Sequence, residues 1–527
     1  MKDGFRQSMA WLHTWTGLLL GWLLFAMFVT GTAAYFQEEI SRWMKPEVIA
    51  APDREAATQA AITYLNRTQP DAENWFISPP SARTPTANVF WQPRKVEGEE
   101  PRKRRGRRGD TSATLDGQGQ PVTARETQGG FFLYRFHFDL HYIPVHWARY
   151  LVGVAAMFML IAIFSGIVTH KKIFADFFML RFGKGQRSWL DAHNVTAVFA
   201  LPFYLMITYT GLVTLATQYM PWGIAANYSQ PDAFFEEVFP GRAEVERSGI
   251  AAPLVPVTPL MEVARQRWNG ADVGSVRVAL PGDSNSTITL TRASSGAIGS
   301  RGESIVFSGT SGDLIEASAP QGGAMATQSV MIGLHAGRFA GWGLRWLYFL
   351  SGIGGTIMVG SGLVLWTVKR RAKLPDPAHP HFGFRLVSRM NVATIAGLPA
   401  GIATYFLANR LLPLGMEARA DWEIHSLFIV WGATLIWAIA RPEKRAWVES
   451  LALAGGLFAA VPVINALTVP RNGITGLLSG DWLFVAFDIA MLILAVGLGF
   501  AARKAARATT AKPPRRARAI KEELATA

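Results

Sequence analysis

Long apolar runs with few charges recur along this chain, and two long polar stretches separate the first four of them. An α-helix needs roughly 20 such residues to cross a bilayer core about 30 Å thick. The pattern predicts an α-helical integral membrane protein of about eight transmembrane helices, with the lipid bilayer as its first partner. The predicted spans are residues 13–35, 147–169, 194–217, 344–367, 391–410, 424–440, 447–468 and 481–502.

The two polar stretches predict folded domains outside the membrane. Each begins with a helical pattern and continues with polar sequence in which apolar residues alternate, as is typical of strands. We therefore expect two small α+β domains, in residues 36–146 and 218–343. The helical patterns cover residues 55–68 and 259–268, and the clearest strands are SVRVAL (275–280), STITLT (286–291) and ESIVFS (303–308).

These elements give the chain a simple order of parts. The last four spans follow both polar domains and form a separate accessory module. The expected parts are a first span within 1–35, a polar domain at 36–146, two spans and their loop at 147–217, a second polar domain at 218–343, a fourth span at 344–367, a loop at 368–390, the accessory spans at 391–502 and a basic tail at 503–527.

The distribution of charge predicts the orientation of the spans in the membrane. The chain is 50% hydrophobic and 17% charged, with a net charge of +14, and its basic residues gather at the ends of apolar runs. This placement fits the excess of Lys and Arg in cytoplasmic loops and does not favour a nucleic-acid partner. It predicts that both termini are cytoplasmic and that both polar domains lie on the outer side of the membrane. The basic run at 101–108 is the exception, and it is either a solvated linker or a site for an anionic lipid or ligand.

The chain contains no cysteine, which limits its possible chemistry. Disulfides, thiolate metal sites, iron–sulfur clusters, cysteine nucleophiles and covalently attached c-type haem are excluded. Any metal or redox centre must use His, Met, Tyr or carboxylate groups. There are ten histidines, and three of them, His137, His141 and His146, fall within ten residues directly before the second span.

An internal repeat relates the first four spans. His13 is followed after sixteen residues by Thr30-Gly31, and His193 is followed after sixteen residues by Thr210-Gly211. Spans two and four match as well, with Arg149 and Arg345 each followed after fifteen residues by Ser-Gly. Both units enter the membrane from the same side, so they predict a parallel repeat about an axis along the membrane normal.

The repeat suggests how the histidines pair. Matching side chains would face each other across the axis, so His13 would face His193 near one membrane surface and His141 would face His335 near the other. Two imidazoles on facing helices are what a six-coordinate b-type haem needs. A divalent-metal or proton transport role remains open from spacing alone, and a duplication would copy structural histidines equally well.

Two other histidines compete for these roles, and a third does not. His170 follows the second span by position and could replace His13 or His193 as a ligand, and His146 could compete with His141. His137 is expected to be structural. Asp139 and Asp191 each stand two residues before a candidate histidine, where they either orient the imidazole or balance nearby basic side chains.

With these motifs in view, residues 5–370 resemble the PepSY-associated transmembrane family. The segments that carry the resemblance are WLHTWTGLLLGW, FHFDLHY, SGIVTHKKIFADFFMLRFGKGQRSWLDAHN, LPFYLMITYTGL and GLHAGRFAGWGLRWLYFLSG. The resemblance implies that the polar domains are PepSY-like. The family often has a further histidine in the third span, but this chain has Tyr204 there, so no ligand is expected at that position.

Members of this family resemble iron-regulated inner-membrane proteins, and one branch comprises ferric-siderophore reductases with two b-type haems. The resemblance implies that His13, His193, His141 and His335 hold two haem b groups, with His170 as the nearest alternative. It further implies electron transfer across the membrane to a periplasmic acceptor such as a ferric siderophore. The accessory spans lie outside the resemblance, so they add no assigned function.

The electron donor and the competing functions remain open in the sequence. No Gly-rich dinucleotide fingerprint follows a predicted strand in the cytoplasmic loops, so the donor would be another protein, a quinol or a small reductant. A non-enzymatic alternative is a regulator whose PepSY-like domains restrain a periplasmic peptidase. A third possibility is a transporter in which histidines and aspartates carry protons or metal ions.

Overall fold

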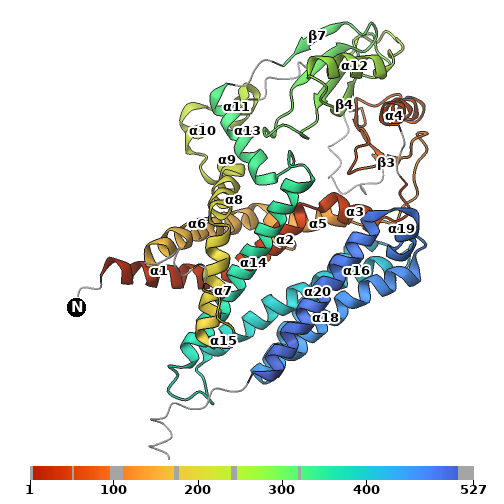
Figure 1. Cartoon of the computed structure of the whole chain (residues 1–527). Coiled ribbons are helices and arrows are strands. Elements are labelled where there is room, and N and C mark those ends of the chain that lie inside the picture. The colour runs from red at the N-terminus through yellow and green to blue at the C-terminus, as the bar shows by residue number, and fades with distance from the viewer. Residues whose placement is uncertain are drawn as a thin grey trace, which may run out of the picture. The chain divides into compact units, whose positions relative to one another are not determined.

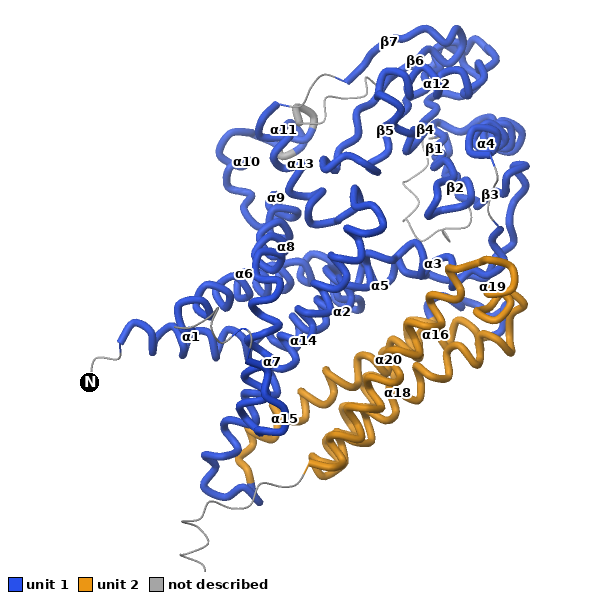
Figure 2. Tube along the Cα trace, viewed as in Figure 1, with its two compact units in different colours: residues 1–379, 413–421 blue, residues 380–412, 422–527 orange. Residues whose placement is uncertain are grey.

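The computed structural model describes residues 4–49, 53–94, 111–170, 177, 179–238, 246–318 and 322–508. The basic run 101–108 and most of the tail after residue 503 lie outside this part of the chain. The chain divides into two compact units, coloured separately in Figure 2. Unit 1 comprises residues 1–379 and 413–421, and unit 2 comprises residues 380–412 and 422–527.

Apolar helices dominate the structure and confirm the prediction of a multi-span helical membrane protein (Figure 1). Among the described residues, six helices are long and apolar enough to cross a membrane, and eight spans result if each of two bent helix pairs counts as one. All eight coincide with the apolar runs of the sequence. The unbroken spans of unit 1 are α6 (Val145–Thr169) and α14 (Trp342–Arg371).

The first and third predicted spans are bent rather than straight. Helix α1 (Phe5–Leu19) meets α2 (Gly21–Ala34) at 64°, and α7 (Gln186–Phe199) meets α8 (Leu201–Thr214) at 68°. Pro202 explains the second bend, because proline lacks the N–H that a continuous helix requires. Glycine favours the first bend, since Gly21 begins α2 at the break.

Small residues let the helices of unit 1 approach closely. Helix α14 packs against both α2 and α7, and α6 packs against α1. A Cβ on Gly352 would lie 2.3 Å from the hydroxyl of Thr32, and a Cβ on Gly355 would lie 2.3 Å from the ring of Phe28. Both glycines are therefore required for the contact between α2 and α14.

The short helices of unit 1 connect the spans to the polar part of the chain. Helix α5 packs against α2 and α3, and α13 packs against α8. Their bounds are α3 (Gln37–Met44), α5 (Gly129–Asp139), α9 (Ala216–Tyr219), α10 (Trp222–Asn227), α11 (Pro231–Val238) and α13 (Gly323–Ala336).

The described strands of both polar stretches join one antiparallel sheet of seven strands, in the order β3-β2-β1-β4-β5-β6-β7. Strand β1 of the first stretch pairs with β4 of the second, with Trp75 opposite Val278. The strands are β1 (Asn74–Ser78), β2 (Ala87–Gln92), β3 (Ser112–Leu115), β4 (Val273–Ala279), β5 (Thr287–Arg292), β6 (Ser304–Ser308) and β7 (Leu314–Ala317).

This sheet corrects the expectation of two separate α+β domains. Helices α4 (Arg54–Thr68) and α12 (Val257–Arg267) agree closely with the predicted helical patterns, but both share one hydrophobic core with strands of both halves. Trp75 and Leu260 belong to this common core. The physical reason is that β1 and β4 would each leave an open sheet edge if the halves stood apart.

Unit 2 consists of long helices that carry the accessory spans. The first span is a continuous helix from Phe382 to Leu411 that contains a π-helical turn, at which the indole N–H of Trp431 donates to the carbonyl of Ala393 at 2.9 Å. Pro399 follows the turn and lacks a backbone donor, which accounts for the local widening. The elements are α15 (Phe382–Val392), η1 (Ala393–Gly397), α16 (Leu398–Leu411), α17 (Arg419–Ala440, whose residues from Trp422 belong to this unit), α18 (Glu443–Thr468), α19 (Gly473–Ser479) and α20 (Trp482–Arg507).

Candidate functional site

Two histidines on the bent helices face each other and form what we call the first pair. His13 lies on α1 and His193 on α7, with ring centres 6.0 Å apart and ring planes at 71°. The Nδ1 atom of His13 lies 2.7 Å from the carbonyl oxygen of Ala162 on α6. Likewise, Nδ1 of His193 lies 2.8 Å from the carbonyl oxygen of Met358 on α14. These bonds make Nδ1 the hydrogen-bond donor and leave Nε2 as the unprotonated nitrogen, the one that can bind a metal.

A second pair has the same construction on other helices. His137 at the end of α5 faces His335 at the end of α13, with ring centres 6.2 Å apart and ring planes at 31°. Nδ1 of His137 lies 2.7 Å from the carbonyl oxygen of Met27 on α2, and Nδ1 of His335 lies 2.9 Å from that of Ile207 on α8. All four imidazoles thus donate to a backbone carbonyl of a neighbouring helix.

The second pair corrects one expected partner, because His137 and not His141 faces His335. Helix α5 ends at Asp139, and the chain then turns through Leu140, His141 and Tyr142, which all have positive φ angles. His141 therefore leaves the helical face that carries His137. The two histidines stand four residues apart, so helical periodicity alone would put both on one face, and only the helix end at Asp139 separates them.

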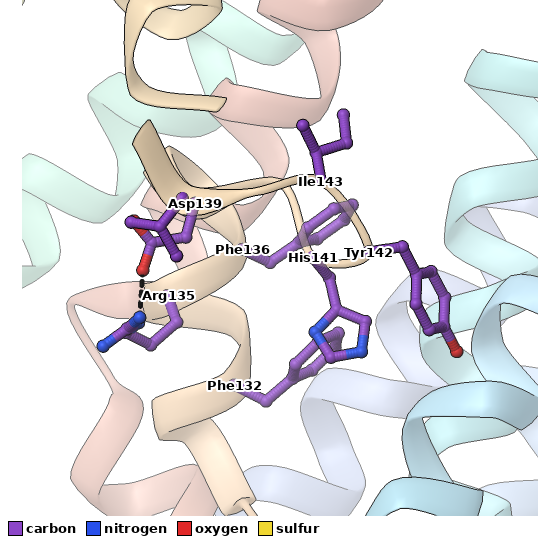
Figure 3. Close-up of a pocket in the computed structure, with 8 residues that line it drawn as sticks. Phe132, Arg135, Phe136, Asp139, His141, Tyr142 and Ile143 are labelled. Atoms are coloured by element: carbon purple, nitrogen blue, oxygen red, sulfur yellow. Dashed lines mark ion pairs between the residues drawn. The ribbon is translucent and has the colours of Figure 1, made fainter. Parts of the chain in front are cut away.

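His141 instead lies at the edge of a cavity of about 160 Å³ (Figure 3). Its ring meets the edge of Phe132 at 5.6 Å and of Tyr142 at 4.3 Å between ring centres. An ion pair between Arg135 and Asp139 closes another side of the cavity. The full lining is Phe132, Arg135, Phe136, Asp139, His141, Tyr142, Ile143 and Val145.

A glycine opposes each paired histidine. A Cβ on Gly31 would lie 2.8 Å from Cε1 of His137, and one on Gly211 would lie 2.8 Å from Cε1 of His335. In the first pair, the corresponding distances are 3.1 Å from Gly166 to His13 and 3.1 Å from Gly362 to His193. The Thr-Gly and Ser-Gly motifs of the sequence therefore supply the space that the imidazoles occupy, and the chain uses this arrangement at all four positions.

The remaining candidate histidines take other positions. Nε2 of His170 lies 2.9 Å from the amide nitrogen of Asn194, next to the first pair but not within it. His146 packs edge-on against Trp147 and Tyr150. Among the described residues, no group of three or more His, Asp or Glu side chains is arranged to hold a bare metal ion.

The nearby carboxylates pair with arginines and do not contact the paired imidazoles in the described hydrogen bonds. Asp191 accepts two hydrogen bonds of 2.8 Å from the guanidinium of Arg181 and one of 3.0 Å from its N–H. Asp139 accepts from Nε of Arg149 at 2.9 Å and forms an ion pair with Arg135. Of the two interpretations left open by the sequence, the structure therefore agrees with charge balance.

The geometry of both pairs fits a six-coordinate haem. Two iron–nitrogen bonds of about 2 Å, with about 1 Å from each nitrogen to its ring centre, place the ring centres roughly 6 Å apart. The observed separations are 6.0 and 6.2 Å. Each imidazole is only partly buried, each is oriented through Nδ1, and each leaves Nε2 for the metal.

The comparisons with known proteins identify the family to which these histidine-bearing helices belong. The family model for the PepSY-associated TM region matches residues 10–369, which include both pairs and the joint sheet. The chain belongs to the PepSY-associated transmembrane family. It is also similar to the uncharacterized protein PA4219 of Pseudomonas aeruginosa, at 25% identity over 342 residues covering 59% of this chain and 80% of that protein. The accessory helices of unit 2 lie beyond the family match.

Proposed function

We propose that this PepSY-associated protein transfers electrons across the bacterial inner membrane through two haem b groups. The first haem would be held by His13 and His193 and the second by His137 and His335. The observation that carries the proposal is the presence of two facing imidazole pairs at the ring separation of a bis-histidine haem. When bound, each haem supplies a carrier for one electron.

The protein's part in this function is to hold and orient the ligands. Hydrogen bonds from Nδ1 to the carbonyls of Ala162, Met358, Met27 and Ile207 fix the tautomer and the direction of each ring. Such bonds also raise the basicity of the ligating nitrogen and so tune the reduction potential. The facing glycines give each ring its place close to the neighbouring helix.

The matched contacts of the two pairs support an origin by duplication. His13 and Met27 are fourteen residues apart, as are His193 and Ile207. In each half, one histidine of the bent span joins the first pair, and the carbonyl fourteen residues later accepts from a histidine of the second pair. The two pairs are therefore held by the same two bent spans, α1–α2 and α7–α8.

The direction of transfer follows from charge. Basic residues flank the spans at the side where we place the cytoplasm, which puts the first pair towards the cytoplasm and the second towards the periplasm. The proposed acceptor is Fe(III) held by a siderophore. One electron converts it to Fe(II), which the hard oxygen ligands of such chelators hold more weakly, so the iron is released.

The donor is a separate molecule in this proposal. All strand pairings within the described sheet are antiparallel, and a dinucleotide-binding unit requires parallel strands joined by a helix. A quinol of the membrane, a reductase protein or a small reductant can supply the electrons.

The deciding experiment is a haem count on the detergent-purified full-length protein from haem-replete cells. We expect b-type spectra before and after dithionite reduction and about two haems per chain by pyridine haemochrome. His193→Ala and His335→Ala should each lose one haem. A haem-free wild-type protein would exclude the electron-transfer function.

A further inference from the structure

Tyr204 occupies an unusual position between the two histidine pairs. It lies on α8, its side chain is fully buried, and its ring meets the edge of Phe28 on α2 at 6.0 Å between ring centres. A Cβ on Gly354 of α14 would lie 2.8 Å from the hydroxyl oxygen of Tyr204. Only glycine at position 354 therefore leaves room for the hydroxyl of Tyr204.

The hydroxyl of Tyr204 satisfies a carbonyl that the bend in this span leaves without its helical partner. In a continuous α-helix, the carbonyl of Thr196 would accept from the N–H of Ala200. At the break, the N–H of Ala200 instead donates to Val198, and the hydroxyl of Tyr204 donates to the carbonyl of Thr196 at 3.0 Å. This bond crosses the 68° bend and connects α7 to α8.

The bond also connects the helices that orient the two histidine pairs. Thr196 lies one turn after His193 on α7, and its own hydroxyl donates to the carbonyl of Ala192 at 2.7 Å and lies 3.2 Å from that of His193. Tyr204 lies one turn before Ile207, whose carbonyl accepts from His335. The angle between α7 and α8 thus determines how the ring of His193 lies relative to the carbonyl that holds His335.

The other half of the protein lacks this bond. The α1–α2 bend occurs at Leu20, whose carbonyl accepts from the N–H of Leu24. In the α7–α8 bend, the carbonyl of Ala200 accepts from the N–H of Tyr204 in the same way. Leu24 therefore holds the position that corresponds to Tyr204, and it has no hydroxyl. The two halves differ at this point, so loss of the hydroxyl should affect His193 and leave His13 on its own helix unchanged.

We propose that Tyr204 is a positioning residue that fixes the orientation of the His193 imidazole through its bond across the α7–α8 bend. The inference rests on the proposed haem function. Ligand orientation alters both the reduction potential and the ferric EPR signal of a haem, whereas a purely structural residue would change only stability.

The test compares Tyr204→Phe with Tyr209→Phe in purified, haem-loaded full-length protein. Tyr209 lies on the same helix with 53% of its surface exposed, so it controls for loss of a phenol. We expect Tyr204→Phe to keep the wild-type haem count but to shift the EPR signal and midpoint potential of one haem. That haem should be the one that His193→Ala removes, and Tyr209→Phe should shift neither signal.

A second variant keeps the test valid if Tyr204→Phe folds poorly. Gly354→Ala retains the phenol but puts a Cβ 2.8 Å from its hydroxyl oxygen, too close for the hydroxyl to keep its place, so it should shift the same signal. Unchanged signals in both variants, or equal shifts of both haems, would overturn the positioning role. A wild-type protein without haem would overturn the proposed function and this inference with it, whereas wild-type haem with unchanged variants would overturn the inference alone.

Discussion

His137 on α5 and His335 on α13 face each other, with ring centres 6.2 Å apart. The Nδ1 atom of each ring donates to a backbone carbonyl of another helix, α2 or α8. The ring of His141, only four residues beyond His137, lies beside Phe132 instead. A turn of the chain at Leu140, with φ of 49°, separates the two histidines. The partner of His335, and with it the proposed second haem site, is thus determined by where α5 ends.

This relationship predicts different effects for two neighbouring substitutions. His137→Ala should reduce the haem content from about two to about one per chain, because one axial ligand is lost. His141→Ala should retain both haems. Pyridine haemochrome assays on the two purified variants make the comparison, and loss of haem from His141→Ala with retention in His137→Ala would reverse the assignment.

The two glycines that lie against the imidazoles of the second pair should not tolerate replacement by alanine. Gly31→Ala and Gly211→Ala would bring a Cβ to 2.8 Å from the rings of His137 and His335, closer than any unstrained contact. Each should therefore weaken the second haem site, seen as a lower haem content or an altered spectrum. Gly17→Ala on α1 is the control, since a Cβ there meets nothing within 4 Å. Equal haem loss in the control would argue against a local effect.

The two haems should give different EPR signals. The ring planes of the first pair stand at 71° and those of the second at 31°. In low-spin ferric haems, a nearly perpendicular arrangement of axial imidazoles gives a highly anisotropic signal, and a more parallel one gives a rhombic signal. We expect one of each in the oxidised protein, with His193→Ala removing the anisotropic signal and His335→Ala the rhombic one. Two identical signals would contradict the ring geometry.

Asp283 should make a pH-dependent contribution to the folding stability of the polar domain. Burial opposes its ionisation, but the N–H of Asn285 and the hydroxyl and N–H of Ser248 donate to the carboxylate, as does the N–H of Gly249. These bonds lower the pKa of Asp283 to about 2. Because the pKa in the folded state is depressed, the stabilisation is present above pH 4 and is lost as the pH falls from about 4 to about 2.

Asp283→Asn should therefore lower the melting temperature near neutral pH, and the difference from wild type should shrink below pH 4. Tryptophan fluorescence can follow this transition, since Trp75 lies in the core of the joint sheet. Asp71→Asn is the matched control because Asp71 is exposed. A constant difference between wild type and Asp283→Asn down to pH 2 would rule out the ionised carboxylate as the source of stability.

Unit 2 contains a buried polar network that should stabilise its helices. The amide oxygen of Asn465 accepts from Nε of Arg410 at 2.8 Å, and its amide nitrogen lies 3.3 Å from Oδ2 of Asp488. Asn465→Ala removes bonds to two buried charged groups and should cost about 1–3 kcal/mol of unfolding free energy. Thr468→Ala, on the exposed face of the same helix, should cost less than about 0.5 kcal/mol. Denaturant titration in detergent measures both, and equal losses would show that the network adds nothing.

The sequence by itself determined the number and position of the apolar spans, because each must supply its own internal hydrogen bonds and an apolar surface. It also determined the helices α4 and α12, three strands of the sheet, and the first histidine pair, since His13 and His193 are each followed after sixteen residues by a Thr-Gly motif. These features depend on the periodic order of apolar and polar residues, which can be seen in a short stretch of sequence.

Only the tertiary structure decided the remaining features. The pairing of β1 with β4 joins segments some two hundred residues apart, and no local pattern specifies which sheet edges meet. Whether His137 or His141 faces His335 depended on the helix end at Asp139 and the left-handed turn that follows. The role of Tyr204 depended on a helix bend that left the carbonyl of Thr196 within reach of its hydroxyl. In each case the deciding contact lies between residues that only the folded chain brings together.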